Sequence, residues 1–496
     1  MSENSGRTFE IGLALAGAIS AGAYTAGVLD FLFQALDEWQ RAHGTDNVPD
    51  HDVVLSAVAG ASAGAITGAL GAVALARGLQ PQALTPEEAA NSYREKNVKY
   101  QRMRCVLPAL YDTWVTRPRM VSADGGIDFL SDEDLRDAGD PDQASVLSLL
   151  NAKLLDDIKH RALVGDGAIV EQPYPFVADP LHVYMTVSNL RGIPFKVEFG
   201  NSSYGMQTHG DRVHYAISCL GASWGHESDW VSEDKHLPLS VRTLPDASPS
   251  SKLPREWDAY GTSALASSAF PIGLASREIE APIEQYHGRK YPLRLDGAAI
   301  NPDFPAGWSP EIFTFRNVDG GLINNNPFDY AQYALAGKIA KLKTAGAEAD
   351  KAVIMIAPFP EPPTFLPDGQ PRPELINVVL ALFPTLINQA RFRASELAPA
   401  MNSQDYSRFL IAPHRKLPTS NTGDGVEECY KIACGLLGGF GGFLDEKFRA
   451  HDFQLGRRNC QAFLRWTLAL PTGNRIVAPM AGRPAYKILP DLSKFG

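Results

Sequence analysis

Cysteine is scarce in this chain of 496 residues, and the few that occur are not paired. There are five, an odd number, and no two form a C-x-x-C motif. Disulfide-stapled domains and zinc modules are built on closely spaced cysteine pairs, so neither a disulfide framework nor a metal site is indicated. We expect free thiols in a cytoplasmic protein. The cysteines are Cys105, Cys219, Cys429, Cys434 and Cys460.

Basic residues are also fewer than acidic ones. Lysine and arginine total 46 against 56 aspartates and glutamates, which gives a net charge of −10. Proteins that bind nucleic acid generally carry an excess of basic residues, so we predict no nucleic-acid partner. The charge balance leaves peripheral membrane contact open, because such contact can rest on a local apolar patch.

Long hydrophobic runs are missing as well. The N-terminal stretch resembles a signal peptide, because Arg7 precedes an alanine-rich segment. Glu10 stands at the start of that segment, however, and glycines interrupt it, so we expect a strand, a loop and a helix instead. Elsewhere no uncharged apolar run is long enough to predict a transmembrane helix.

A G-x-S-x-G motif centred on Ser62 is the most informative feature that the chain does contain. Residues 51–58 before it are apolar and partly β-branched, as in a buried strand, and residues 65–76 after it favour a helix. A serine on such a sharp strand-to-helix turn exposes its hydroxyl, and Gly60 and Gly64 remove side chains that would collide there. Ser62 is therefore our candidate nucleophile.

The order of the expected elements is typical of an α/β fold. They are strand 8–16, loop 17–22, helix 24–41, strand 52–58, helix 63–77, strands 181–187 and 195–199, helix 260–269, helix 328–344 and strand 352–357. We predict a catalytic domain over residues 1–360, with a helical insertion or cap over 78–180. Residues 361–496 are predicted to form a mostly helical C-terminal extension.

A serine nucleophile needs a base, and none of the eleven histidines stands in an obvious motif. A desolvated carboxylate can serve instead, and Asp319 is the best candidate. Gly320 and Gly321 after it allow a sharp turn that leaves the carboxylate uncrowded. Asp296 is a weaker alternative, because it lacks the Asn-rich continuation and the helix that follow Asp319.

Taken together, the G-x-S-x-G motif, the Asp-Gly-Gly turn and the order of the expected elements resemble the patatin-like phospholipases, which are Ser/Asp acyl hydrolases without a catalytic histidine. The resemblance extends over residues 11–360 and includes the segments 12–17, 22–29, 186–192 and 266–271. It implies a three-layer α/β/α fold, Ser62 as nucleophile and Asp319 as base. It also implies a lipid or fatty-acyl ester as substrate, and no metal or organic cofactor.

The glycine-rich oxyanion loop departs from the family pattern of three glycines, any residue, a basic residue and glycine. The stretch from Gly17 reads Gly-Ala-Ile-Ser-Ala-Gly, so Ala18 and Ile19 replace glycines and the basic residue is missing. Backbone N–H groups of Gly17, Ala18, Ile19 and Ala63 can still stabilise an oxyanion. A positive φ at Ile19 would be costly, however.

Several alternatives stay open. The same Ser/Asp pair fits a broader esterase, a thioesterase or an acyltransferase, and the altered loop leaves room for a non-catalytic lipid-binding protein. The apolar segment 375–383 fits either a lipid-surface patch or a buried helix. The glycine cluster at 435–442 fits either a lid hinge or close packing of helices. The headgroup, acyl position, oligomeric state and regulatory partners are not determined by the sequence.

Overall fold

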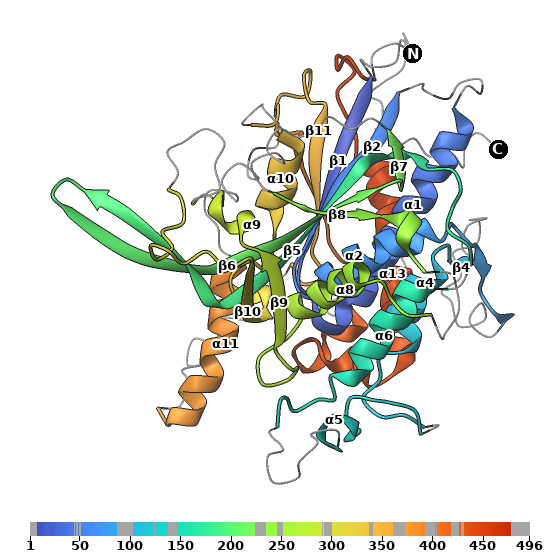
Figure 1. Cartoon of the computed structure of the whole chain (residues 1–496). Helices are drawn as coiled ribbons and strands as arrows, with labels where there is room; N and C mark the ends of the chain where they lie inside the picture. The colour runs from blue at the N-terminus through green and yellow to red at the C-terminus, as the bar shows by residue number, and fades with distance from the viewer. Residues whose placement is uncertain are drawn as a thin grey trace.

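A mixed α/β sheet with helices on both faces forms the centre of the protein (Figure 1), which confirms the predicted fold class. The computed structural model describes residues 7–43, 51–86, 103–136 without 124, 146–223 without 166, 235–245, 251–289, 300–336, 341–360, 373–391, 404–417 and 431–477, and positions 45, 48, 291, 402, 426 and 427. The alternative base, Asp296, lies outside these residues.

The described part of the central sheet has ten strands, and its main path runs β12-β11-β1-β2-β5-β10-β9. They are β1 (Thr8–Leu15), β2 (Asp52–Gly60), β5 (Tyr174–Phe199), β6 (Ser202–Ser218), β7 (Gly221–Ser223), β8 (Leu237–Ser240), β9 (Arg277–Pro282), β10 (Ile312–Asp319), β11 (Lys351–Ile356) and β12 (Arg408–Ile411). Neighbouring strands along the path from β12 to β5 are parallel to each other, whereas β10 is antiparallel to both of its neighbours, β5 and β9. The parallel strands β1 and β2 end at the same edge, where ligand sites of such sheets form.

Alternating side chains of the strands divide the core into two layers. Leu13 of β1 and Val58 of β2 face one side of the sheet, under helices α1 (Gly22–Ala42), α2 (Ala63–Ala76), α8 (Arg255–Ser267) and α13 (Glu446–Trp466). Ala14 and Ala57 face the other side, under α10 (Phe328–Ala336). Together these elements form three α/β/α layers.

The N-terminal stretch forms the expected strand, loop and helix. By length and composition alone, the helical residues Ile19–Ala42 could cross a membrane, but 83% of their most apolar window is buried inside the fold. This stretch comprises the short helix η1 (Ile19–Ala21) and α1, which packs against α2 and α13. It is therefore a core helix.

The β5–β6 hairpin differs most from the sequence-based expectation. The two predicted strands 181–187 and 195–199 belong to one long strand, and the stretch after them, for which we predict no strand, contains β6. The hairpin projects from the sheet as an arm (Figure 1), and the outer residues of β6 are exposed on both faces. With no face to bury, the outer part of β6 shows only a weak alternation of apolar and polar residues by which to recognise a strand.

The stretch 78–180 contributes small elements around the main helices. They are strands β3 (Gln82–Ala83) and β4 (Met103–Cys105), helices α4 (Pro108–Tyr111), α5 (Glu133–Arg136) and α6 (Lys153–Val164), and the π-helical turn η2 (Asp112–Thr116). Further along lie the short helices η3 (Val241–Thr243), α9 (Glu284–His287) and η4 (Gly320–Leu322).

The C-terminal residues are joined to the main fold. Their elements are α11 (Leu375–Arg391), β12, β13 (Lys416–Leu417), β14 (Val426–Glu427), η5 (Ala433–Gly439), η6 (Gly441–Phe443) and α13. Strand β12 extends the central sheet, and α13 packs so tightly on α1 that a Cβ at Gly27 would lie 1.9 Å from the Phe453 carbonyl oxygen. The domain boundary near residue 360 and the extent of the 78–180 insertion stay predictions.

Candidate active site

Ser62 lies on a tight turn between β2 and α2. Its backbone has a φ of 52° and a ψ of −125°, a conformation that L-residues adopt at a cost. A Cβ at Gly60 would lie 2.5 Å from the Gly64 carbonyl oxygen, and one at Gly64 would lie 2.2 Å from that of Leu15. The turn therefore requires both glycines for space, and it presents the serine at the carboxyl edge of the sheet.

Asp319 ends β10 and meets Ser62 directly. The Ser62 hydroxyl donates to Oδ2 of Asp319 at 2.7 Å, while Oδ1 accepts the Gly321 N–H at 2.7 Å. The Asp319 backbone is fixed on both sides, because its N–H donates to the Ala269 carbonyl and its own carbonyl accepts from the Ser188 hydroxyl. The carboxylate is thus held in one orientation.

Gly320 and Gly321 are needed for close packing. A Cβ at Gly320 would lie 2.1 Å from the Thr186 carbonyl oxygen, and one at Gly321 would lie 2.9 Å from Oδ1 of Asp319. Neither glycine is among the residues with positive φ. The two glycines therefore leave the carboxylate uncrowded, as expected, and the turn after Asp319 is made without a positive φ.

Burial controls the charge of Asp319. Desolvation raises its pKa from 3.8 to about 6, against the smaller lowering effects of the hydrogen bonds from Ser62 and Gly321. Near neutral pH the carboxylate is still ionised, but it is a stronger base than an exposed aspartate. This is the protonation behaviour that a general base requires.

The four predicted oxyanion donors are not equivalent. The Gly17 N–H donates to the Asn325 carbonyl at 3.1 Å and is occupied. Within the described residues, the N–H groups of Ala18, Ile19 and Ala63 have no acceptor. Ile19 has a φ of 49°, the left-handed conformation that its branched side chain disfavours. The loop thus offers two N–H groups and α2 a third.

Sequence reasoning missed Ser267, the serine whose hydroxyl binds the backbone N–H of the nucleophile. Ser267, fully buried at the end of α8, accepts the Ser62 N–H on its hydroxyl at 2.9 Å. This bond removes the Ser62 N–H from the set of free donors. Ser267 falls within the 266–271 segment that the resemblance singled out, but nothing local indicates its partner.

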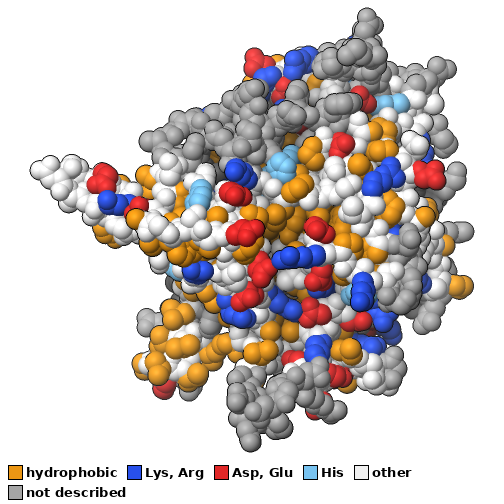
Figure 2. All heavy atoms as spheres, viewed as in Figure 1, with side chains coloured by type: hydrophobic (Ala, Val, Ile, Leu, Met, Phe, Trp, Pro, Cys, Tyr) orange, Lys and Arg blue, Asp and Glu red, His pale blue; other side chains and the backbone are white. Residues whose placement is uncertain are grey.

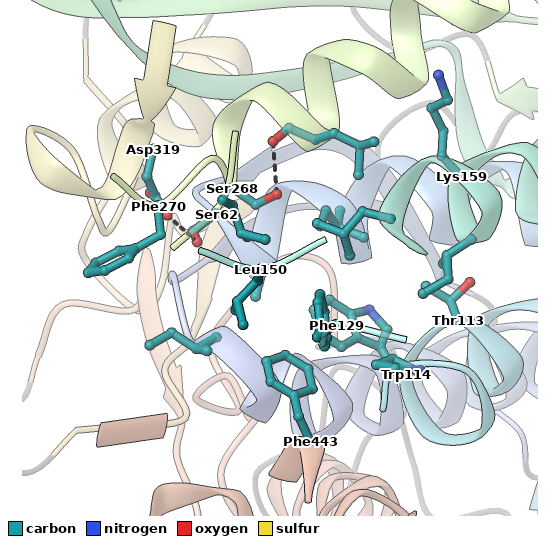
Figure 3. A pocket seen from close by; sticks show the side chains of 18 of the residues that line it. Ser62, Thr113, Trp114, Phe129, Leu150, Lys159, Ser268, Phe270, Asp319 and Phe443 are labelled. Atoms are coloured by element: carbon teal, nitrogen blue, oxygen red, sulfur yellow. Dashed lines mark hydrogen bonds between the residues drawn. The ribbon is translucent and has the colours of Figure 1, made fainter. Parts of the chain in front are cut away.

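An apolar pocket begins at the Ser62 hydroxyl (Figure 3), and its empty space is about 710 Å³ with the part that is open solvent included. Ser62 and Asp319 lie at one end, and Thr113 and Lys159 at the other. The Lys159 ammonium is already paired with Asp258 at 2.8 Å. The other lining residues are Ile19, Ala63, Ile66, Leu70, Trp114, Pro118, Phe129, Leu150, Leu155, Ile158, Leu265, Ser268, Phe270, Leu274, Phe440 and Phe443.

The pocket walls come from several parts of the chain. Trp114 and Phe129 belong to the stretch 78–180, whereas Phe440 and Phe443 come from the C-terminal residues. The described residues contain no group of three or more His, Cys, Asp or Glu side chains arranged to hold a metal ion. The chemistry available here is that of a serine, a carboxylate and backbone N–H groups beside an apolar chamber.

Comparison with known proteins agrees with this geometry. The model of the patatin-like phospholipase family matches residues 13–331. The uncharacterized protein y4iI of Sinorhizobium fredii (strain NBRC 101917 / NGR234) is 44% identical over 474 residues, which are 94% of this chain. The chain spans 65% of that protein's length. The chain therefore belongs to the patatin-like phospholipase family, whose members are typically lipid acyl hydrolases.

Proposed function

We propose that this protein is a serine acyl hydrolase that cleaves fatty-acyl esters of lipids, in the manner of a phospholipase A or lysophospholipase. The observation that carries the proposal is the 2.7 Å hydrogen bond from Ser62 to the buried Asp319 at one end of an apolar pocket. An activated hydroxyl beside a chamber without free charge suits an ester with a long hydrocarbon chain.

In the acylation step, Ser62 Oγ attacks the ester carbonyl carbon while Asp319 takes the hydroxyl proton. Charge then develops on the carbonyl oxygen, which the N–H groups of Ala18, Ile19 and Ala63 would stabilise. The carbon–oxygen bond to the leaving group breaks, the alcohol departs with the proton from Asp319, and Ser62 carries the acyl group.

In the deacylation step, Asp319 accepts a proton from a water molecule that attacks the acyl-enzyme carbonyl. The second tetrahedral intermediate uses the same N–H groups. Its collapse breaks the bond to Ser62 Oγ, returns the proton to that oxygen and releases the fatty acid. Asp319 thus serves as base and acid in turn.

Release of fatty acid from defined lipids tests this proposal. We expect the full chain to release fatty acid from a phospholipid or lysophospholipid. Ser62→Ala should abolish the release, and Asp319→Asn should slow it by about 10²–10⁴-fold, because a general base contributes about that much. Undiminished release by Ser62→Ala would contradict the proposal.

The related acyl-transfer reactions differ in the leaving group or the acceptor. A thioesterase would prefer acyl thioesters, and an acyltransferase would pass the acyl group to an added alcohol instead of water. A non-catalytic lipid-binding protein would bind lipid equally well with and without Ser62. The ionised, hydrogen-bonded carboxylate and the three unoccupied N–H groups favour catalysis over binding alone.

We also propose peripheral contact with a lipid surface through α11. The exposed apolar side chains described on this helix range from 38% at Val379 to 80% at Leu375, its outer end, whereas Ala390 near the other end is buried. Figure 2 shows the helix as an orange projection at the lower left. No charged residue occurs from Leu375 to Ala390, so burial in hydrocarbon meets no desolvation penalty for charge.

The position of α11 connects this surface to the candidate site. The helix packs beside η4, which directly follows Asp319. Lipid bound along α11 would therefore lie near the turn that carries the proposed base. Because no basic residue occurs from Leu375 to Ala390, we expect binding to zwitterionic and anionic bilayers alike. Cytoplasmic location stays a prediction.

A further inference from the structure

The short helix η1, which carries the altered oxyanion loop, lies against a segment from the far end of the chain. The fully buried Ser20 donates its hydroxyl hydrogen to the Gly439 carbonyl, 419 positions later. The same Ser20 oxygen accepts the Gly442 N–H at 3.2 Å. We call residues Ala433–Phe443, which comprise η5 and η6, the clamp segment.

The clamp segment also contacts Ile19, the residue with the strained backbone. A Cβ at Gly439 would lie 3.2 Å from Cδ1 of Ile19 and 3.4 Å from its Cβ, so the glycine lies directly against the isoleucine. Gly439 itself has a φ of 98°. A left-handed conformation at a non-glycine residue is strained and persists only where its surroundings hold it. At Ile19 those surroundings include the clamp segment.

The clamp segment is in turn fixed to α13. The Asp452 carboxylate accepts the N–H groups of Ala433 and Cys434, each at 2.8 Å. The Arg449 guanidinium donates to the Gly442 carbonyl at 2.6 Å. Because α13 packs tightly on α1, the segment is tied to the same core helix that follows the oxyanion loop. These bonds favour close packing over a lid hinge for this glycine cluster.

We propose that Ser20 is a positioning residue and that the clamp segment holds Ile19 in its left-handed conformation, so that the Ala18 and Ile19 N–H groups are aimed at the oxyanion. The inference rests on the proposed acyl hydrolase function. It assigns an active-site role to residues beyond 331, where the match to the family ends. It also accounts for the tolerance of alanine and isoleucine where the family has glycines.

Steady-state kinetics on a soluble short-chain ester test the clamp, with the full chain as wild type, Ser20→Ala, Ile19→Gly and the double variant. We expect Ser20→Ala to lower kcat by about 10–10²-fold with little change in KM, because a misplaced catalytic group costs about that much. Glycine adopts positive φ without penalty, so adding Ile19→Gly should restore most of the lost kcat. Wild-type kcat in Ser20→Ala, or no recovery in the double variant, would overturn the proposal.

A second pair of variants decides the question if Ser20→Ala does not fold. Gly439→Ala adds a methyl group against Ile19. The matched control is Gly307→Ala, because Gly307 also has a positive φ, of 77°, but has open space where the methyl group would lie. Both changes strain the backbone, but only Gly439→Ala should lower kcat. Equal kcat in the two variants would overturn the clamp. Absence of Ser62-dependent turnover in the wild type would instead contradict the underlying function.

Discussion

Asp319 holds Ser62 with one carboxylate oxygen and the Gly321 N–H with the other, so the proposed base is oriented by the turn that follows it. Only the oxygen that faces Ser62 is available for proton transfer. This arrangement, inside a buried site, links the ionisation of one carboxyl group to both turnover and stability.

The first prediction concerns the pH dependence of turnover. Asp319 must be ionised to accept the Ser62 proton, and burial raises its pKa to about 6. We expect kcat/KM on a soluble ester to be constant above pH 7 and to fall about tenfold per pH unit well below pH 6. A rate profile without an inflection between pH 5 and 7 would argue against Asp319 as the base.

The second prediction concerns stability, where the sign is opposite to that of activity. The folded-state pKa of Asp319 is raised, so the folded protein binds more protons than the unfolded chain between about pH 4 and pH 6. This carboxyl group therefore contributes less to the free energy of unfolding as pH rises through that range.

Removing the negative charge of Asp319 should recover the free energy of unfolding that is lost when this buried carboxyl group ionises. Asp319→Asn keeps a carbonyl oxygen for the Gly321 N–H, and we expect it to be more stable than wild type at pH 8 by up to about 3 kcal/mol. The difference should shrink at pH 4. Denaturant unfolding at both pH values measures it, with Ser62→Ala as the control that keeps the carboxyl group. A variant less stable than wild type at pH 8 would contradict the assigned cost of burial.

The third prediction concerns the acyl pocket. Thr113 lies at the end of the pocket away from Ser62, so Thr113→Phe should shorten the space for the chain without touching the reacting groups (Figure 3). We expect kcat/KM to fall about tenfold or more for long-chain esters, because loss of each buried methylene costs about 0.8 kcal/mol. Short-chain esters should be hydrolysed as before. Equal losses for both chain lengths would mean that the pocket does not hold the acyl chain.

The fourth prediction concerns α11. Replacing two of its exposed apolar residues, Ile376→Glu and Leu380→Glu, should abolish flotation of the protein with phosphatidylcholine vesicles. Hydrolysis of a soluble ester should not change, because neither side chain lines the pocket.

Trp466 provides the matched control for that experiment. It is 75% exposed at the end of α13, and the chain after it reaches the amino-terminal edge of the sheet, where Asn474 bonds to the carbonyls of Gly346 and Ala349. Trp466→Glu should float like wild type. If the α11 variant with both replacements floats as well as Trp466→Glu, α11 is not the lipid contact.

The parts of the fold that sequence predicts here are those with a local signature. The strand-to-helix turn at Ser62 and the Asp-Gly-Gly turn at Asp319 have their own composition, and they contact each other. Ser20 and Ser267 have no such signature, because their hydrogen bonds join residues hundreds of positions apart. The glycine cluster of the clamp segment is visible in the sequence, but nothing local indicates its partner. The sequence of α11 does not distinguish a buried helix from a lipid-binding helix, since the two can have the same composition.

Labelling with a fluorophosphonate probe tests the central claim most directly, since it requires an activated serine but no knowledge of the lipid. The account predicts covalent modification on the peptide that contains Ser62, identified by mass spectrometry. It predicts slower labelling in Asp319→Asn and none of that peptide in Ser62→Ala. Modification of a different serine, or no modification of folded wild-type protein, would contradict it.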